Sequence, residues 1–186
     1  MAEVIILVEG FTKTDNSGEN GKTCCTMTLV RDGDLVMVVD PGTLKNQNIL
    51  SDALEKEGLS VNDVNAVFLT HSHIDHFRNV GMFPSAKVIE FYGEWDGENV
   101  IDRIDQLSDD IKIIETPGHA STGLTLLVKT DKGKVAICGD VFWKKDYPKV
   151  DDYADDVEKL KESRVKVLEM ADYIIPGHAG MYPSKE

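Results

Sequence analysis

The sequence predicts a layered α/β fold with helices outside two packed, mostly antiparallel or mixed sheets. Apolar strand-like runs and helix-like runs follow one another in the order strands, helix, strand, and this order occurs twice. The 186 residues fit one domain of ordinary size, and 41% hydrophobic with 28% charged residues is typical of a globular chain. We therefore expect a single domain over residues 1–186 with no appended substrate domain.

The first half begins with strands that we expect to pair in antiparallel order. Val4–Val8 is a short apolar run, which predicts a buried strand. Residues 10–22 are polar and rich in glycine, which predicts an exposed loop. Thr23–Val30 alternates as a strand does, and the turn residues Asp32-Gly33 predict a hairpin into Leu35–Val39.

Two helices and the remaining strands follow from the same patterns. Apolar residues at helical spacing predict helices over Leu44–Glu57 and Asp151–Met170. Short apolar runs predict strands at Ala66–Thr70, 86–92, Ile111–Glu115, Leu124–Thr130, Lys134–Cys138 and Tyr173–Ile175. Residues 93–110 hold seven acids and one base, and we expect an acidic connecting stretch there.

The charge and the cysteines limit the classes of partner. Lys and Arg number 20 against 33 Asp and Glu, and the net charge of -13 disfavours a broad nucleic-acid or anionic-membrane surface. No targeting segment and no apolar run of spanning length is evident. Adjacent Cys24 and Cys25 would point to opposite faces of a strand, so they form a poor disulfide pair. We expect a reduced, cytoplasmic chain.

A dense group of metal-ligand residues follows the strand at Ala66–Thr70. Residues 71–76 read His-Ser-His-Ile-Asp-His. Side chains two apart in an extended segment point the same way, so His71 and His73 can hold one ion. Asp75 and His76 come where the chain turns, and they could face a second ion. Imidazoles and carboxylates suit zinc and similar metals.

Three further candidates occupy the same local setting later in the chain. His119, Asp140 and His178 each follow a predicted strand, and a glycine precedes each of them. Glycine allows a sharp turn and a close approach of the backbone. Loops at strand ends are where catalytic groups concentrate. With these positions, all five histidines of the sequence fall in the candidate site.

The pattern His-x-His-x-Asp-His followed by separate His, Asp and His resembles the metallo-β-lactamase superfamily. The likeness runs in the family's order from Asp40 to His178. It implies an αββα sandwich with the metals at one edge of the two sheets. It also implies ligand roles: one ion bound by His71, His73 and His119, the other by Asp75, His76 and His178, and Asp140 bridging the two. Asp40 matches an acid that supports the site, although a purely structural role is an alternative.

Residues 76–84 resemble more closely the small intracellular branch typified by metallo-β-lactamase domain-containing protein 1. Arg78 stands where the family often has glycine, and it could attract an anionic substrate group or pair with a nearby acid. Trp143 lies in one of the segments expected to contact substrate, with packing against the sheet edge as the alternative. The residues after His119 also differ from the family pattern, and a supporting oxygen could come from Ser121 or Thr122.

The resemblance implies a dinuclear zinc hydrolase that uses a metal-bridging hydroxide. We expect two Zn²⁺ per chain, with iron or manganese as alternatives. Asp75 would orient the hydroxide and carry a proton to the leaving group, and Asp140 would bridge the ions. The expected substrate is a small molecule with an ester, thioester, lactone or β-lactam bond, and β-lactam cleavage would be a promiscuous activity.

Three other functions use the same residues differently. A phosphodiesterase or ribonuclease would act on nucleic acid, which the acidic charge disfavours. A persulfide dioxygenase would use one iron and leave several of the seven candidates idle. A non-catalytic metal-binding protein would have little need of the full set. We expect no membrane association, and exposed strand edges are compatible with a homodimer.

Overall fold

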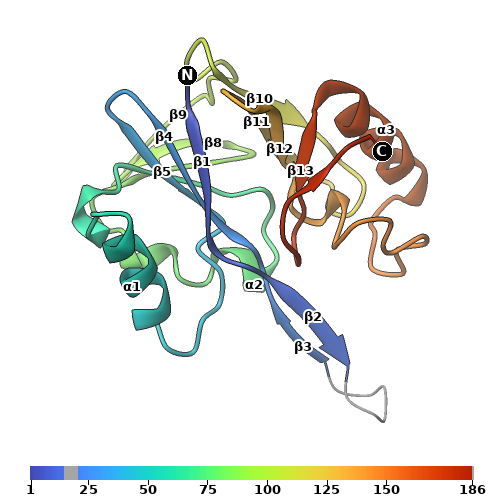
Figure 1. The fold of residues 1–186 in the computed structure, drawn as a ribbon, viewed down its shortest axis with the longest axis horizontal. Helices are drawn as coiled ribbons and strands as arrows, with labels where there is room; N and C mark the ends of the chain where they lie inside the picture. Colours follow the sequence, from blue (N-terminus) through green and yellow to red (C-terminus); the bar gives the residue numbers. More distant parts are fainter. Residues whose placement is uncertain (15–20, 186) are drawn as a thin grey trace.

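Two β-sheets pack face to face in the computed structural model, which describes residues 1–14 and 21–185 (Figure 1). The larger sheet has the strand order β1-β4-β5-β6-β7-β8-β9. Its strands are β1 Glu3–Val8, β4 Met27–Asp32, β5 Leu35–Val39, β6 Ala66–Phe68, β7 Lys87–Glu90, β8 Gly93–Asp96 and β9 Asn99–Ile101. The smaller sheet is ordered β10-β11-β12-β13-β14. Its strands are β10 Ile111–Glu115, β11 Leu124–Thr130, β12 Gly133–Ile137, β13 Tyr173–Ile175 and β14 Tyr182–Pro183.

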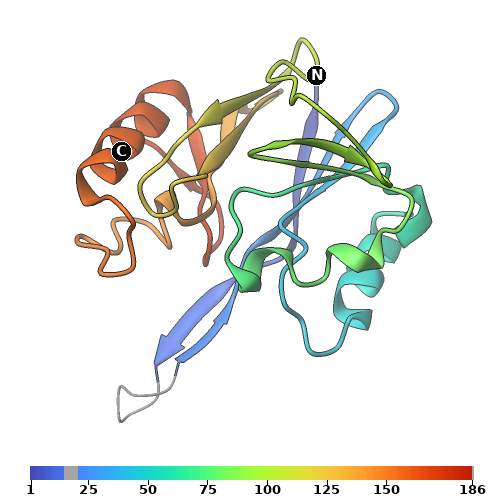
Figure 2. The same ribbon diagram turned by 180° about the vertical axis from the view of Figure 1, so that it is seen from behind.

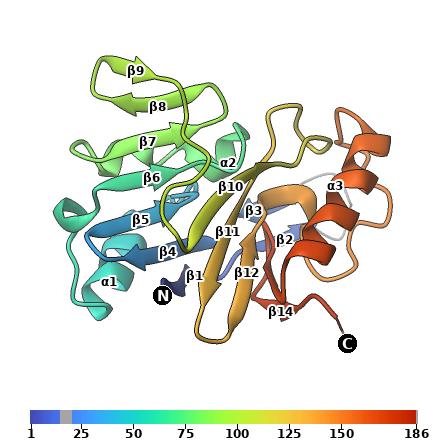
Figure 3. The ribbon, with the colours of Figure 1, turned by 90° about the horizontal axis from the view of Figure 1, so that it is seen from above.

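One longer helix covers the outer face of each sheet. The α-helices are α1 Asn48–Lys56, α2 Ile74–Phe77 and α3 Val157–Met170, and short 3-10 turns lie at Val61–Asp63, Val80–Met82 and Gly139–Val141. The view from above separates α1 and α3 to opposite sides of the molecule, with the sheets between them (Figure 3). Both sheets are mixed, since each contains parallel and antiparallel pairs. The predicted αββα arrangement is confirmed.

Three apolar clusters hold these layers together. Phe68, Ile113 and Leu126 belong to the central cluster between the sheets. Leu50 of α1 and Leu160 of α3 belong to the two outer clusters, each between a helix and its sheet. Strands buried on both faces need apolar residues at consecutive positions, which accounts for the continuous apolar run of β5.

Strand direction brings several loops to one place. β6 runs parallel to β5, and β13 runs parallel to β12. β10 has the same direction as β12, because both are antiparallel to β11. The chain therefore leaves β10, β12 and β13 at a common edge of the smaller sheet, and it leaves β5 and β6 at a common edge of the larger one.

The expectation of a loop over residues 10–22 is wrong for the part that is described. β2 Phe11–Thr14 and β3 Gly21–Cys24 pair antiparallel and project from the body as a separate two-stranded sheet (Figures 1 and 2). Residues 15–20 lie outside the described residues. The expected strand Thr23–Val30 is accordingly divided between β3 and β4. Pairing between two polar segments contributes no apolar pattern, so the hairpin is invisible to periodicity.

Two other expectations are corrected in the second half. The acidic stretch 93–110 contains the paired strands β8 and β9, which extend the larger sheet. The helix expected from Asp151 begins at Val157. Asp156 caps it by accepting hydrogen bonds from the backbone N–H groups of Glu158 and Lys159. The late start leaves Asp151 outside the helix.

Two further expectations concern disulfide bonds and membrane-spanning helices. Cys24, Cys25 and Cys138 are buried and form no disulfide, as expected for the adjacent pair. Over residues 1–14 and 21–185, none of the helices has both the length and the apolar character needed to cross a membrane.

Candidate metal centre

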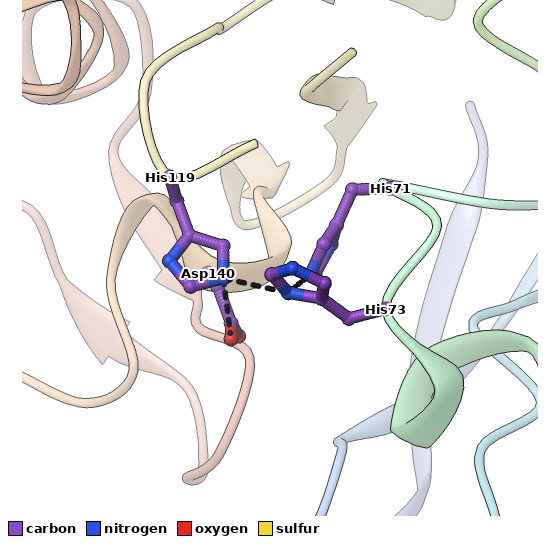
Figure 4. Close-up of side chains that lie close together, drawn as sticks. All are labelled: His71, His73, His119 and Asp140. Atoms are coloured by element: carbon purple, nitrogen blue, oxygen red, sulfur yellow. Dashed lines mark hydrogen bonds and ion pairs between the residues drawn. The ribbon is translucent and has the colours of Figure 1, made fainter. Parts of the chain in front are cut away.

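The seven predicted ligand residues converge at one edge of the sandwich in two groups. Within each group, the candidate ligand atoms lie within 4.8 Å of one another. The first group contains His71, His73, His119 and Asp140, which point toward one another in Figure 4, and the second contains Asp75, His76 and His178. Each residue follows a strand end or lies in the short helix α2, so the rigid sheets position all of them.

The spacing of atoms in the first group suits a tetrahedral ion. His73 Nδ1 lies 3.0 Å from His71 Nε2 and 2.9 Å from His119 Nε2. His119 Nε2 lies 3.3 Å from Asp140 Oδ2. Ligand atoms about 2.0–2.1 Å from a tetrahedral zinc ion are about 3.3 Å apart from one another. These contacts therefore have the size of a ligand shell.

Asp140 also contacts the second group. Its Oδ1 lies 3.3 Å from His76 Nε2 and 3.2 Å from His178 Nε2. His178 Nε2 is 3.7 Å from Asp75 Oδ2. A single carboxylate thus faces donor atoms of both groups. Gly177 permits this approach, because a Cβ there would overlap Asp140 Oδ1.

Two buried polar atoms in the centre have no hydrogen-bond partner among residues 1–14 and 21–185. These atoms are His76 Nε2 and Asp140 Oδ1, which face each other without hydrogen-bond geometry. Buried polar groups are nearly always satisfied, so such a pair requires an explanation. A divalent cation between an imidazole nitrogen and a carboxylate oxygen would satisfy both atoms. The residues present fit such an ion.

Burial keeps part of the first group in the form that binds metal. Burial, together with the neighbouring His76, holds the pKa of His71 well below its usual value. Burial and the nearby His119 also lower the pKa of His73. Both imidazoles are therefore neutral near pH 7, with a nitrogen lone pair available to a cation.

Around Asp140, the carboxylate and its neighbouring histidines shift one another's pKa values toward the charged forms. Burial opposes ionisation of Asp140, but His76 and the hydrogen bond from His178 outweigh it and hold the Asp140 pKa well below its usual range. Burial likewise opposes protonation of His76, yet Asp140 and Asp40 raise its pKa well above the usual value. Asp140 also raises the pKa of His178 against burial. The pocket thus favours positive charge beside Asp140, which a metal ion can supply.

Comparison with known proteins identifies the family. The profile of the Metallo-beta-lactamase superfamily matches residues 22–100. Metallo-beta-lactamase domain-containing protein 1 of Xenopus laevis is 30% identical over 185 residues, covering 94% of this chain and 78% of the frog protein. The chain belongs to the metallo-beta-lactamase superfamily. The predicted likeness to the branch of that frog protein is confirmed as well.

Solved metallo-beta-lactamase folds match nearly the whole chain. The crystal structure of a candidate metallo-beta-lactamase from Thermotoga maritima superposes with a TM-score of 0.75 at 21% identity, over 98% of this chain and 99% of that one. AidC, a dizinc quorum-quenching lactonase, gives a TM-score of 0.66 at 17% identity, over 88% and 76% of the two chains. The chain is a metallo-hydrolase of this superfamily, with histidine and aspartate groups suited to a divalent metal.

Asp40, which we predicted to support the metallo-beta-lactamase centre, contacts it directly. Its Oδ2 lies 2.8 Å from His76 Nδ1 and accepts a 2.6 Å hydrogen bond from the hydroxyl of Thr70. The same hydroxyl lies 3.0 Å from His71 Nδ1. Asp40 has a φ of 49°, an unusual value for a residue other than glycine. Its carboxylate therefore orients one histidine of each group.

Asp151 supports His119 and was not found from the sequence. Its Oδ2 lies 2.7 Å from His119 Nδ1, and its side chain is completely buried. Its Oδ1 accepts a 3.0 Å bond from the backbone N–H of Tyr153. The expected oxygen from Ser121 or Thr122 is thus replaced by a carboxylate from a distant loop. Nothing in the sequence distinguishes Asp151 from the acids beside it.

The β2–β3 hairpin supplies a further contact that sequence reasoning missed. The Thr23 hydroxyl donates a 3.0 Å bond to Asp75 Oδ2 and lies 3.1 Å from His178 Nδ1. The backbone oxygen of Cys24 lies 3.0 Å from the same nitrogen. Both residues belong to the segment expected to be a plain strand, Thr23–Val30, and no local pattern marks them as part of the site.

The two predicted substrate contacts occupy different positions. Trp143 lies beside the centre, with its ring centroid 6.3 Å from that of His119 and 6.1 Å from that of His178. Its indole N–H is buried and has no hydrogen-bond partner among the described residues. Arg78 is exposed and directly follows α2. Only Trp143 is in ring contact with the candidate ligands.

Proposed function

We propose that this chain is a dinuclear zinc hydrolase that cleaves a carbonyl substrate such as a lactone, ester or thioester. The observation that carries the proposal is the position of Asp140, whose two oxygens face His119 on one side and His76 and His178 on the other. A carboxylate shared between two donor sets is an arrangement that suits a pair of ions. The dizinc lactonase AidC, which shares the fold, supports this substrate class.

Asp75 and Asp140 would have different roles in the hydrolysis. Two bound zinc ions would supply an activated water and polarise the substrate carbonyl. Asp75 has a side chain 16% exposed, compared with 6% for Asp140. Asp75 is thus the more accessible of the two carboxylates and would be the one that hands a proton to the leaving group, whereas Asp140 would face both ions.

Trp143 would form one wall of the substrate site. Its ring packs against Tyr153, with centroids 5.8 Å apart, and Tyr153 is largely exposed. An aromatic pair beside the metal groups suits an acyl chain or a small ring better than a polyanion. The net charge of -13 also favours a small-molecule substrate over nucleic acid, because a negatively charged protein repels the phosphates of a nucleic acid.

The test combines metal analysis with a substrate panel. The purified protein would be assayed for bound metal and then tested on a lactone, a thioester, nitrocefin and single-stranded RNA. We expect two zinc ions per chain and cleavage of the lactone or thioester, with both lost in Asp140→Ala. One iron per chain and oxygen consumption with a persulfide would instead establish the dioxygenase. Cleavage of RNA alone would establish the nuclease.

A further inference from the structure

The projecting β2–β3 hairpin carries a side chain that joins two candidate ligands of the second group. We infer that Thr23 is a positioning residue that sets the affinity of the second group for its metal ion. Its hydroxyl lies 3.0 Å from Asp75 Oδ2 and 3.1 Å from His178 Nδ1. The inference rests on the proposed function in one respect, namely that Asp75, His76 and His178 hold an ion.

Hydrogen-bond chemistry gives Thr23 two roles at once. His178 Nε2 faces Asp140, 3.2 Å away, so a metal there requires the proton to reside on Nδ1. That N–H can donate to the Cys24 carbonyl at 3.0 Å and to the Thr23 oxygen at 3.1 Å. The Thr23 hydroxyl remains free to donate to Asp75 Oδ2. One hydroxyl thus fixes the tautomer of His178 and the orientation of Asp75.

The strand segment that carries Thr23 is fastened to the loop that carries His178. The backbone N–H of Thr26 donates a 2.6 Å bond to the Gly177 carbonyl. The Thr26 hydroxyl donates to the Ala179 carbonyl at 2.9 Å and accepts from the Gly10 N–H at 3.1 Å. Residues on both sides of His178 are therefore held against this segment. Thr23 is consequently held at a fixed position relative to the ligands it contacts.

Residues other than Thr23 orient the histidines of the first group, so the predicted effect of Thr23 is confined to the second group. His119 is bonded to Asp151, and His71 contacts Thr70. Over residues 1–14 and 21–185, the Thr23 hydroxyl contacts candidate ligands of the second group and none of the first. Loss of the Thr23 hydroxyl should therefore weaken one metal and leave the other unchanged. Thr23 itself is exposed, so its substitution should leave the core intact.

The experiment compares matched variants of the metal-free protein. Wild type, Thr23→Val, Thr23→Ala and Thr23→Ser would be titrated with Co²⁺ while visible absorption and calorimetry follow each equivalent. Thr28→Val is the matched control, because the Thr28 hydroxyl is buried and has no hydrogen-bond partner in the part of the chain that the structure describes. Circular dichroism would check that every variant is folded.

We expect the valine and alanine variants to bind the first equivalent normally and the second about 10- to 100-fold more weakly, as is typical for loss of a group that orients a ligand. Serine keeps the hydroxyl and should restore the second equivalent, and Thr28→Val should match wild type. Equal weakening of both equivalents, or two unchanged equivalents in Thr23→Val, would overturn the inference. A wild-type protein that binds one equivalent would instead overturn the dinuclear proposal and the inference with it.

Discussion

Asp151→Asn tests whether the buried carboxylate behind His119 controls the first metal group. Asparagine has the same shape but only one acceptor oxygen, so with that oxygen toward His119 its NH2 group takes the place of the oxygen that accepts from the Tyr153 N–H. The charge-assisted hydrogen bond to His119 Nδ1, now 2.7 Å long, then becomes a neutral one. Bonds to charged groups contribute about 1.5–3 kcal/mol, and neutral bonds about 0.5–1.5 kcal/mol.

The expected loss is therefore about 1–1.5 kcal/mol at the His119 imidazole. Since about 1.4 kcal/mol corresponds to a tenfold change in affinity, the first metal should bind about tenfold more weakly. Asp151→Ala is the stronger perturbation, because it leaves the buried His119 Nδ1–H without an acceptor. A buried donor without a partner costs about 1–3 kcal/mol, so this variant should also melt at a lower temperature.

The assay is a metal titration that resolves the two equivalents, paired with thermal unfolding of the metal-free protein. Asp151→Asn should weaken the first group and spare the second, the reverse of the Thr23→Val pattern. The reasoning fails if Asp151→Asn binds both equivalents with wild-type affinity. It also fails if the loss falls on the group that contains His178, since Asp151 touches only His119 among the candidate ligands.

Three further expectations follow from the same geometry. Gly177→Ala should abolish binding at both groups in a metal titration, because the added Cβ would displace the Asp140 carboxylate. Zinc uptake near pH 7 should release protons, because the metal must displace a proton from His76, whose pKa in the metal-free protein lies well above its usual value. Calorimetry in buffers of different ionisation enthalpy would measure that release, and a buffer-independent heat would contradict it. Thr28→Val should raise the melting temperature or leave it unchanged, because it removes a buried hydroxyl that has no hydrogen-bond partner among the residues described.

The candidate ligands could be predicted from the sequence because each is marked locally. His71 follows an apolar strand, and His119, Asp140 and His178 each follow a glycine at a strand end. These signals depend on only a few neighbouring residues. The layered fold could be predicted for a similar reason, since the order of strands and helices is itself a local property summed along the chain.

The supporting contacts could not be predicted because they join residues far apart in the chain. Asp151 and His119 are separated by 32 positions, and Thr23 and His178 by 155. Asp151 is one of 33 acids, and its sequence surroundings resemble those of a solvated helix start. Only the packed structure shows which acid is buried against an imidazole. The β2–β3 hairpin was missed on the same ground, because its pairing depends on register and not on composition.

Both metal groups take residues from both halves of the molecule. In the first group, His71 and His73 follow the larger sheet, whereas His119 and Asp140 follow the smaller one. Bound ions would therefore link the two sheets at the edge where the apolar core between them ends. The core between the sheets is formed by apolar residues such as Phe68 and Leu126 and contains none of the candidate ligands. The histidines and carboxylates lie at the ends of the strands that this core packs together, so the apolar packing positions the metal centre.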